Sequence, residues 1–360
     1  MTSPEGPNGR VRVMLVEDSL VVRALLTHIV SRDARLELVA AVGSGEEALA
    51  VLDTVRPDVI SMDIRLPGID GLETTRRIMA ERPTPIVVVA DSVEDSSLKI
   101  SMNALRAGAL SVVEKPVGTT NAGYEGIATE ICTQLRIMAE VPVIRRRPIG
   151  ASWTARNLAF QPSAMRATAA PSVLAIAAST GGPPALARVV GGLPEDFPLP
   201  VLIVQHIGAA FMEGFASWLN GVVALPVSVG RDGERAQSGR AYVAPGDRHL
   251  EFGPGGVLRI SDAPPVGGQR PAATVLFRSV ARHAGPRGIG LLLTGMGEDG
   301  AAGLLDMRRA GAATIAEDES TAVVFGMPAA AIRLSAAGTV LPLDRMAAHL
   351  IQVAMPGSPQ

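Results

Sequence analysis

The sequence predicts an α/β protein of two domains, each built on a mainly parallel sheet. Short β-branched apolar runs alternate with amphipathic stretches from Val11 to Ala139. The alternation stops in residues 141–171 and resumes at Ser172. A chain of 360 residues is too long for one ordinary domain and has a suitable length for two.

The first half contains five runs short enough to be strands. They read VRVMLV, LELVAAV, DVISM, PIVVVA and LSVVE, and amphipathic stretches such as 19–31 and 45–55 follow them. A helix from Gly123 to Ala139 closes the unit. Residues 11–140 therefore predict a doubly wound, flavodoxin-like domain with a five-stranded parallel sheet. We expect residues 1–10 to be disordered.

Residues 141–171 predict a linker. They contain three consecutive arginines, several prolines and small residues without a steady period. A passive tether is the simpler interpretation, and an amphipathic docking segment at 153–160 is the alternative.

Residues 172–356 predict a second parallel-sheet α/β domain. The strand candidates read SVLAIA, PVLIVQ, LPVSV, RAYVA, GIGLLL and AATIA, and LEF and VLRI across GPGG predict a hairpin. The expected helices are 183–190, 211–220, 273–283, 300–310 and 326–333.

The composition argues against several classes of protein. A net charge of −2 gives no general attraction to nucleic acid or to an anionic membrane. We find no secretory signal and no apolar run of roughly 18 residues that would span a membrane. The single cysteine, Cys132, excludes an internal disulfide and suits a reducing compartment. We expect a cytoplasmic protein that neither inserts into membranes nor binds nucleic acid.

Acidic side chains follow two strands of the first predicted sheet. Glu17 and Asp18 follow the first strand, Asp63 follows the third, and Lys115 follows the fifth. These positions meet at one edge of a parallel sheet. Three carboxylates repel one another unless a cation lies among them, and few hard oxygen ligands with open positions favour Mg²⁺. A carboxylate beside Mg²⁺ can attack phosphorus, and Lys115 would stabilise phosphoryl oxygens. A cis bond at Lys115–Pro116 would fix where the lysine points.

Helix capping is the alternative role for these acids. Asp18 and Asp63 stand where N-cap residues stand. Capping alone does not explain an acid pair, a third acid and a Lys-Pro pair at one sheet edge, so the combination favours a phosphoryl-transfer site.

The motifs VEDS, MDIRLPGIDG and EKP resemble those of the response-regulator receiver domain, over roughly Val11 to Ala139. The resemblance implies that Asp63 accepts phosphate from a histidine kinase, that Glu17, Asp18 and Asp63 hold Mg²⁺, and that Lys115 stabilises the phosphoryl group. Three positions depart from the pattern. Ala90 replaces a small hydroxyl residue, Val112 replaces an aromatic residue, and Arg65 stands two residues past the phosphoacceptor, where Asn or an acid is common. These departures put the coupling of phosphorylation to output in doubt.

A lone hydroxyl, Ser179, stands between a strand and a helix in VLAIAASTGGPPAL. It could cap the helix, help to bind phosphate, or act as a nucleophile. Phosphate binding is disfavoured because the segment lacks both G-x-G-x-x-G spacing and a P-loop lysine. The nucleophile interpretation gains from His206 and Asp299, which also follow apolar strands, since all three would meet at one sheet edge. The glycines around Met296 suit a turn whose N–H groups could bind an oxyanion.

Other residues compete for these roles. His249 is the main rival to His206 as the base, and Asp318 is a weaker rival to Asp299. His28 and His349 lie on predicted helices, and His283 ends one, so we expect structural or exposed positions for these three.

The motifs AASTGGPPAL, VQHI, YVAPGDRHLEF, VLFRSVA, LLLTGMGEDGAAGL and VVFGMPAAA resemble the CheB family of chemotaxis protein-glutamate methylesterases, from Ser172 to about Met355. The resemblance implies a Ser179–His206–Asp299 triad, with Thr180 and Met296 lining the site. It further implies hydrolysis of γ-glutamyl methyl esters and deamidation of certain glutamines on chemoreceptors, control by a CheA-type kinase, and no cofactor in the esterase domain. Ala272 and Thr274 depart from the family pattern, which has a serine and an acid there. The departure indicates either a lost cap or contact at the helix that follows, or an altered receptor-facing groove.

Two other functions stay open. The chain could be a phosphorylation-regulated serine hydrolase of a pathway other than chemotaxis, or a phosphorylation-controlled binding module with an inactive site.

Overall fold

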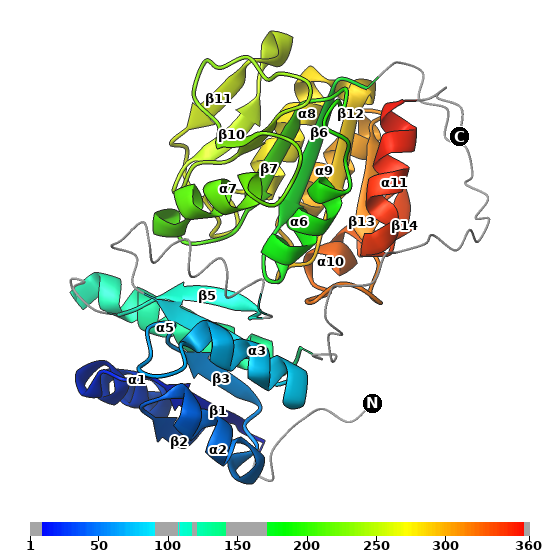
Figure 1. The fold of residues 1–360 in the computed structure, drawn as a ribbon. Coiled ribbons are helices and arrows are strands. Elements are labelled where there is room, and N and C mark those ends of the chain that lie inside the picture. Colours follow the sequence, from blue (N-terminus) through cyan, green and yellow to red (C-terminus); the bar gives the residue numbers. More distant parts are fainter. Residues whose placement is uncertain (1–8, 91–106, 108, 117–120, 142–170, 356–360) are drawn as a thin grey trace.

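The computed structural model describes residues 9–90, 107, 109–116, 121–141 and 171–355. Most of the expected disordered N-terminus and nearly all of the expected linker, including 153–160, lie outside the described residues. The described chain forms two α/β halves, each with its own parallel sheet (Figure 1).

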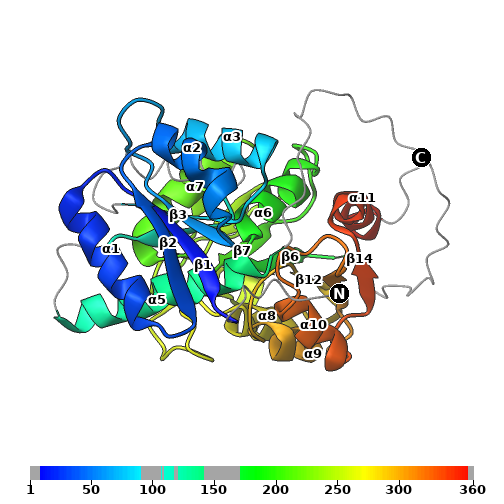
Figure 2. The same cartoon turned by 90° about the horizontal axis from the view of Figure 1, so that it is seen from below.

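The first half contains a five-stranded parallel sheet in the order β2-β1-β3-β4-β5. Helices α1 and α5 cover one face of the sheet, and α2 and α3 cover the other (Figure 2). The alternation of buried residues along β1 explains the two layers, because Val13 and Leu15 pack with α1 and α5 whereas Met14 and Val16 pack with α2 and α3. The elements are β1 (Val11–Val16), α1 (Leu20–Arg32), β2 (Leu36–Val42), α2 (Gly45–Val55), β3 (Val59–Met62), α3 (Gly71–Glu81), β4 (Ile86–Ala90), β5 (Ser111–Glu114) and α5 (Asn121–Ala139).

Local capping chemistry sets where the helices of this half begin. The side chain of Ser19 accepts a hydrogen bond from Val22 N at 3.4 Å, and Asp70 Oδ1 accepts one from Glu73 N at 2.7 Å. The N-caps of α1 and α3 are therefore Ser19 and Asp70. Asp18 and Asp63 cap neither helix, which removes the capping alternative for both.

The second half contains a seven-stranded sheet in the order β14-β13-β12-β6-β7-β9-β8, and every neighbouring pair is parallel. Helices α6, α7 and α11 pack on one face, and α8, α9 and α10 pack on the other. The elements are β6 (Val173–Ala178), α6 (Gly182–Gly191), β7 (Val201–Gln205), α7 (Met212–Asn220), β8 (Val227–Val229), β9 (Ala241–Val243), β10 (His249–Phe252), β11 (Leu258–Ser261), α8 (Ala273–His283), β12 (Gly288–Leu292), α9 (Ala301–Arg309), β13 (Ala313–Glu317), α10 (Met327–Arg333), β14 (Thr339–Leu341) and α11 (Leu343–Ala354).

Two details differ from the sequence-based expectations. The edge strand β14 was not expected, because three residues, TVL, give too short a signal. Lys115–Pro116 is not cis, since the cis peptide bond within the described residues is Arg270–Pro271. The expected hairpin is present, with β10 and β11 antiparallel around residues 253–256.

The two halves share apolar contacts. Ala109 and Val112 belong to the same buried cluster as the α6 and α7 side chains, and Val323 and Val324 of the second half pack against the cluster formed by α1 and α5. The β5 side of the first half therefore lies against the second half (Figure 1).

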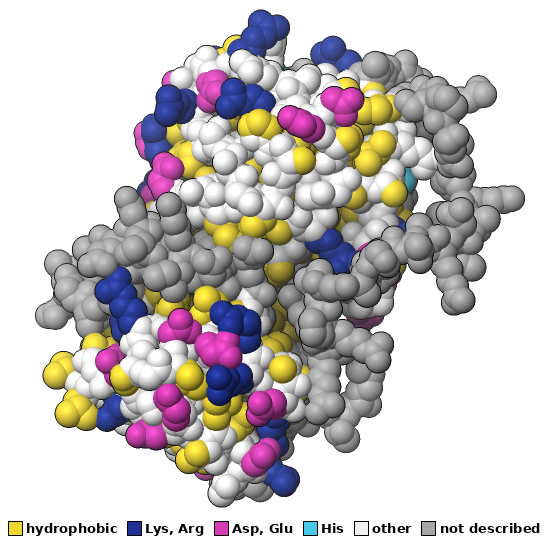
Figure 3. Space-filling model, in the orientation of Figure 1, with side chains coloured by type: hydrophobic (Ala, Val, Ile, Leu, Met, Phe, Trp, Pro, Cys, Tyr) yellow, Lys and Arg dark blue, Asp and Glu magenta, His cyan; other side chains and the backbone are white. Residues whose placement is uncertain are grey.

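The surface of both halves carries mixed charge. On the face shown in Figure 3, cationic and anionic side chains are interspersed over both halves.

Candidate functional sites

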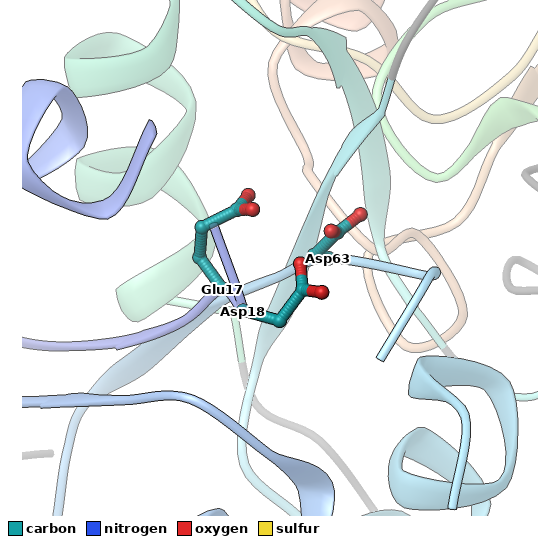
Figure 4. Close-up of side chains that lie close together, drawn as sticks. All are labelled: Glu17, Asp18 and Asp63. Carbon is teal, nitrogen blue, oxygen red and sulfur yellow. The ribbon is translucent and has the colours of Figure 1, made fainter. Parts of the chain in front are cut away.

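The three acidic residues of the first half converge at the carboxyl edge of its sheet. Each of Glu17, Asp18 and Asp63 has a carboxylate oxygen within 4.8 Å of one on the other two (Figure 4). Glu17 and Asp63 are buried, whereas Asp18 is exposed. The parallel order β2-β1-β3 brings the ends of β1 and β3 side by side, as expected from the sequence.

Lys115 bridges the two buried acids. Its Nζ lies 2.9 Å from Glu17 Oε2 and 2.9 Å from Asp63 Oδ2. Burial, together with the charge of Asp63, raises the pKa of Glu17 to about 7. Burial also raises the pKa of Asp63 despite Lys115. Burial opposes the charge on Lys115, but the two carboxylates outweigh it and raise its pKa. One lysine therefore compensates the acids only in part, and the donor set suits a divalent cation.

Arg65 contacts the acid cluster through its backbone. Its N–H lies 3.3 Å from Asp63 Oδ1, and its side chain is exposed. Ala90 ends β4 as a buried residue, and Val112 of β5 is also buried.

The serine, histidine and aspartate of the second half follow three adjacent strands. Ser179 follows β6, His206 follows β7, and Asp299 lies in the turn between β12 and α9. Because β12, β6 and β7 are parallel neighbours, their carboxyl ends share one edge.

His206 and Asp299 form a close, buried pair. His206 Nε2 lies 2.9 Å from Asp299 Oδ2, and both side chains are 8% exposed. Burial favours the neutral form of Asp299, but hydrogen bonds from His206 and Thr274 outweigh it and hold its pKa below the usual value. An ionised carboxylate only accepts hydrogen bonds, so the histidine proton lies on Nε2 and Nδ1 is left as the basic nitrogen.

Asp299 also holds the start of α8. Its Oδ2 accepts a hydrogen bond from Ala273 N at 2.6 Å, and its Oδ1 accepts one from Thr274 N at 3.0 Å. The N-cap of α8 is Ala272, which has no capping side chain. The cap expected to be missing at Ala272 is therefore supplied by Asp299. Thr274 Oγ1 accepts a hydrogen bond from Gly300 N at 2.9 Å and ties the two segments together.

The backbone around Ser179 is held by the end of β12. Ser179 N donates to Thr294 O at 3.0 Å, and Thr294 Oγ1 donates to Thr180 O at 2.9 Å. A Cβ at Gly295 would lie 2.7 Å from Ser179 Cβ, so this close approach requires glycine. Within the described residues, the Ser179 hydroxyl forms no hydrogen bond. Ser179 and His206 nevertheless line one cavity, and links between a nucleophile and its base often tighten only when substrate binds.

Gln205 is a residue whose role the sequence interpretation missed. Its Nε2 donates to Ser179 O at 2.8 Å and to His206 O at 2.9 Å, and the side chain is 1% exposed. One amide thus joins the backbones of the candidate nucleophile and base. The available signal was a polar side chain ending the otherwise apolar run VLIVQ.

The cavity at this edge has a volume of about 290 Å³ and is lined by both halves of the chain. The second half contributes Ser179, His206 and Arg270, among others. The first half contributes residues that include Val112 of β5 and Glu130 of α5.

Thr180 also lines this cavity, whereas Met296 is not among its lining residues and its side chain is 50% exposed. The turn expected around Met296 is present, with Gly297 at φ 83°.

The competing residues have other partners. His249 is fully buried, its Nδ1 accepts a hydrogen bond from Ala272 N at 3.1 Å, and its Nε2 lies 3.2 Å from Pro264 O. Asp318 accepts hydrogen bonds from Ser320 in a turn after β13. His28 is exposed, while His283 and His349 are half-buried. The geometry therefore favours His206 and Asp299.

Two families match the chain. The response regulator receiver domain matches residues 13–122, and the CheB methylesterase matches residues 174–350. A protein-glutamate methylesterase/protein-glutamine glutaminase of Paramagnetospirillum magneticum is 53% identical over 97% of this chain and 99% of that protein. A relative of the same name from Myxococcus xanthus is 43% identical over 95% of this chain and 97% of that protein. The crystal structure of the Thermotoga maritima CheB methylesterase catalytic domain aligns with a TM-score of 0.50 and 34% identity, covering 51% of this chain and 100% of that one.

These findings define the class of protein as a receiver domain joined to an α/β ester hydrolase. The chain belongs to the CheB methylesterase family, and it is a carboxylic ester hydrolase. No helix within the described residues is both long and apolar enough to cross a membrane.

Proposed function

We propose that this enzyme hydrolyses γ-glutamyl methyl esters on chemoreceptors, and deamidates receptor glutamines, through a Ser179–His206–Asp299 triad. The observation that carries the proposal is the His206–Asp299 pair, joined at 2.9 Å through Nε2 at the sheet edge where Ser179 stands. The names of its relatives supply the substrate class.

The chemistry follows from the roles of the three groups. Ser179 Oγ attacks the ester carbonyl carbon while His206 Nδ1 takes the hydroxyl proton. The tetrahedral intermediate expels methoxide, which leaves as methanol with the proton from His206. Water then attacks the acyl-enzyme with the same base, which releases the glutamate carboxyl group and restores Ser179. With a glutamine substrate, ammonia leaves in place of methanol.

The backbone at the start of α6 is suited to bind the oxyanion. Within the described residues, neither Thr180 N nor Gly181 N donates a hydrogen bond. Gly181 has a φ of 76°, and the adjacent Gly182 N is already bonded to Ser179 O. Two free N–H groups beside the nucleophile and at a helix N-terminus match the requirement for a developing negative charge. The exposed Met296 would contact substrate from the rim.

Asp63 is the proposed phosphorylation site of the receiver domain. Glu17, Asp18 and Asp63 would hold Mg²⁺, which when bound neutralises charge on the phosphoryl oxygens. Asp63 would accept the phosphoryl group from a CheA-type histidine kinase. Lys115 would exchange its contact with the Asp63 carboxylate for one with the phosphoryl oxygens.

Phosphorylation would act on the esterase through the wall that the receiver contributes to the cavity. Val112 and Glu130 line the cavity together with Ser179 and His206. We therefore expect the receiver to restrict the access of a receptor helix to the site until the receiver moves. Phosphorylation would shift the population toward open forms. Ala90 and Val112 replace the hydroxyl and aromatic residues of the receiver pattern. The coupling of phosphorylation to the opening of the esterase site therefore requires its own test.

We also propose the domain boundaries expected from the sequence, with a receiver at 11–140, a linker at 141–171 and an esterase at 172–356. We further propose that the protein is cytoplasmic.

Methanol release from methylated receptor membranes tests the proposal. Wild-type enzyme should release methanol, and a small acyl phosphate with Mg²⁺ should increase the rate. Ser179→Ala should abolish release, whereas Ser217→Ala, which alters an exposed serine of α7, should not.

Two outcomes would favour the competing functions. Activity on model methyl esters without activity on receptors would favour a hydrolase of another pathway. Wild-type protein that shows no turnover and is not labelled by a phosphonate probe of reactive serines would favour a binding module.

A further inference from the structure

Glu317 is a fully buried acid that the proposed chemistry does not use. It ends β13 and is 0% exposed. Its Oε2 accepts a hydrogen bond from Thr294 N at 2.7 Å, and its Oε1 lies 3.1 Å from Thr321 Oγ1. The carboxyl group therefore links the end of β12 to the loop that follows β13.

Thr294 connects this carboxyl group to the candidate nucleophile. Thr294 O accepts a hydrogen bond from Ser179 N at 3.0 Å, and its Oγ1 donates to Thr180 O at 2.9 Å. A displacement of Thr294 would move the backbone of both residues. Because catalysis depends on placement to within a fraction of an ångström, such a displacement would lower the rate.

The hydrogen bonds around Glu317 accommodate a protonated carboxyl group, and Asp318 O also accepts from Thr321 N and Ala322 N at 3.1 Å. Thr321 Oγ1 accepts from Leu343 N at 3.0 Å and lies 3.4 Å from Asp318 O. A hydroxyl has one proton, so it cannot donate to both Glu317 and Asp318 O. If Glu317 carries the proton, it donates to Thr321, and Thr321 donates to Asp318 O. All of these contacts are then satisfied.

The surroundings of Glu317 also disfavour a negative charge. Within the described residues, it forms no ion pair, and Asp318 is the charged group whose field acts on it. Its hydrogen-bond partners Thr294 and Thr321 and its neighbour in sheet register, Leu341, are uncharged. Burial, reinforced by Asp318, raises the pKa of Glu317 to about 7.

We propose that Glu317, as a neutral acid, is a positioning residue that holds Ser179 through Thr294. Its ionisation would loosen the nucleophile, because a fully buried carboxylate without an ion pair among the described residues favours displacement of the side chain toward water. The inference rests on the proposed function, since it assumes that Ser179 is the nucleophile. It adds an alkaline limit to the activity.

Three variants of the full-length chain test this role, with ester turnover measured from pH 6 to pH 9. Glu317→Leu keeps the volume but cannot bond Thr294, so kcat should fall at least tenfold while KM changes less than twofold. Glu317→Gln can accept from Thr294 and donate to Thr321 without ionising, so it should restore kcat. Above pH 7 the kcat of wild type should fall by up to about tenfold per pH unit, whereas the kcat of Glu317→Gln should not. Glu319→Gln, at an exposed acid two residues further on, should follow the wild-type profile.

A second measurement does not require receptor substrates. The rate at which a phosphonate probe labels Ser179 should show the same alkaline fall in wild type and not in Glu317→Gln. An infrared carbonyl band of a protonated carboxyl group, present in wild type at pH 6 and absent from Glu317→Gln, should disappear by pH 8.5.

Parallel pH profiles for wild type and Glu317→Gln would overturn the inference, even if Glu317→Leu fails to fold. Failure of the proposed function would give a different result. If Ser179 is not the nucleophile, Ser179→Ala keeps its ester turnover, whatever the Glu317 variants do.

Discussion

His206 contacts Asp299 through Nε2, at 2.9 Å from Oδ2, so Nδ1 is the nitrogen that would serve the proposed nucleophile Ser179. The same carboxylate accepts backbone hydrogen bonds from Ala273 and Thr274 at the start of α8. One side chain thus contacts the proposed base and closes a helix end, which would tie the proposed active site to the stability of the fold.

Asp299→Asn should separate these two effects. An amide cannot hold the histidine tautomer, so kcat should fall by about 10³- to 10⁴-fold. Loss of one α8 contact should also lower the free energy of unfolding by about 0.5 to 2 kcal/mol. Kinetics and urea unfolding measure the two changes. Asp318→Asn, at the rival acid, should keep kcat within about threefold near pH 7, and a larger loss there than at Asp299 would contradict the assignment.

Gln205→Glu should reduce activity while preserving shape. An ionised carboxylate cannot donate to Ser179 O or His206 O, and three acceptors would then face one another. We expect kcat to fall at least tenfold, with partial recovery at low pH as the new carboxyl group gains a proton. A variant as active as wild type at pH 8 would show that the amide bridge is dispensable.

Mg²⁺ binding to the receiver should depend on the ionisation of Glu17. Because burial raises its pKa to about 7, a proton competes with the metal below that value. Calorimetric affinity for Mg²⁺ should therefore fall by up to about tenfold per unit as pH drops from 7 to 6. Glu17→Gln should bind more weakly and lose this dependence, whereas Glu37→Gln on β2 should behave as wild type. Equal affinities at pH 6 and pH 8 for wild type would argue against a role for Glu17.

Stability should fall as pH rises from about 4.5 to about 7 because of Glu317. Its pKa is raised from 4.5 to about 7 in the folded chain, so the folded state keeps a proton that the unfolded state loses. The contribution is therefore fully present below pH 4.5 and is lost as pH rises through about 7. It amounts to about 3 kcal/mol. Unfolding free energies from pH 5 to pH 8 should show this loss in wild type and not in Glu317→Gln, and coincident curves would contradict it.

The order of residues along the chain was enough to predict both sheets and most of the site. Apolar runs that alternate with amphipathic stretches specify parallel strands, and parallel strands share a carboxyl edge. The side chains that follow them, Glu17 and Asp63 in one half and Ser179 and His206 in the other, therefore gather without further information.

Tertiary structure alone decided which nitrogen of His206 meets Asp299, that Asp299 caps α8 in place of a local side chain, and that His249 has structural partners. It also decided that the short strand β14 forms, that Val112 of the receiver lines the cavity of the esterase, and that Glu317 is buried with no ion pair to another described residue. Each of these depends on contacts between segments far apart in the chain. Hydrogen-bond direction, burial and the resulting charge state arise from such contacts, and no local pattern of residue types encodes them.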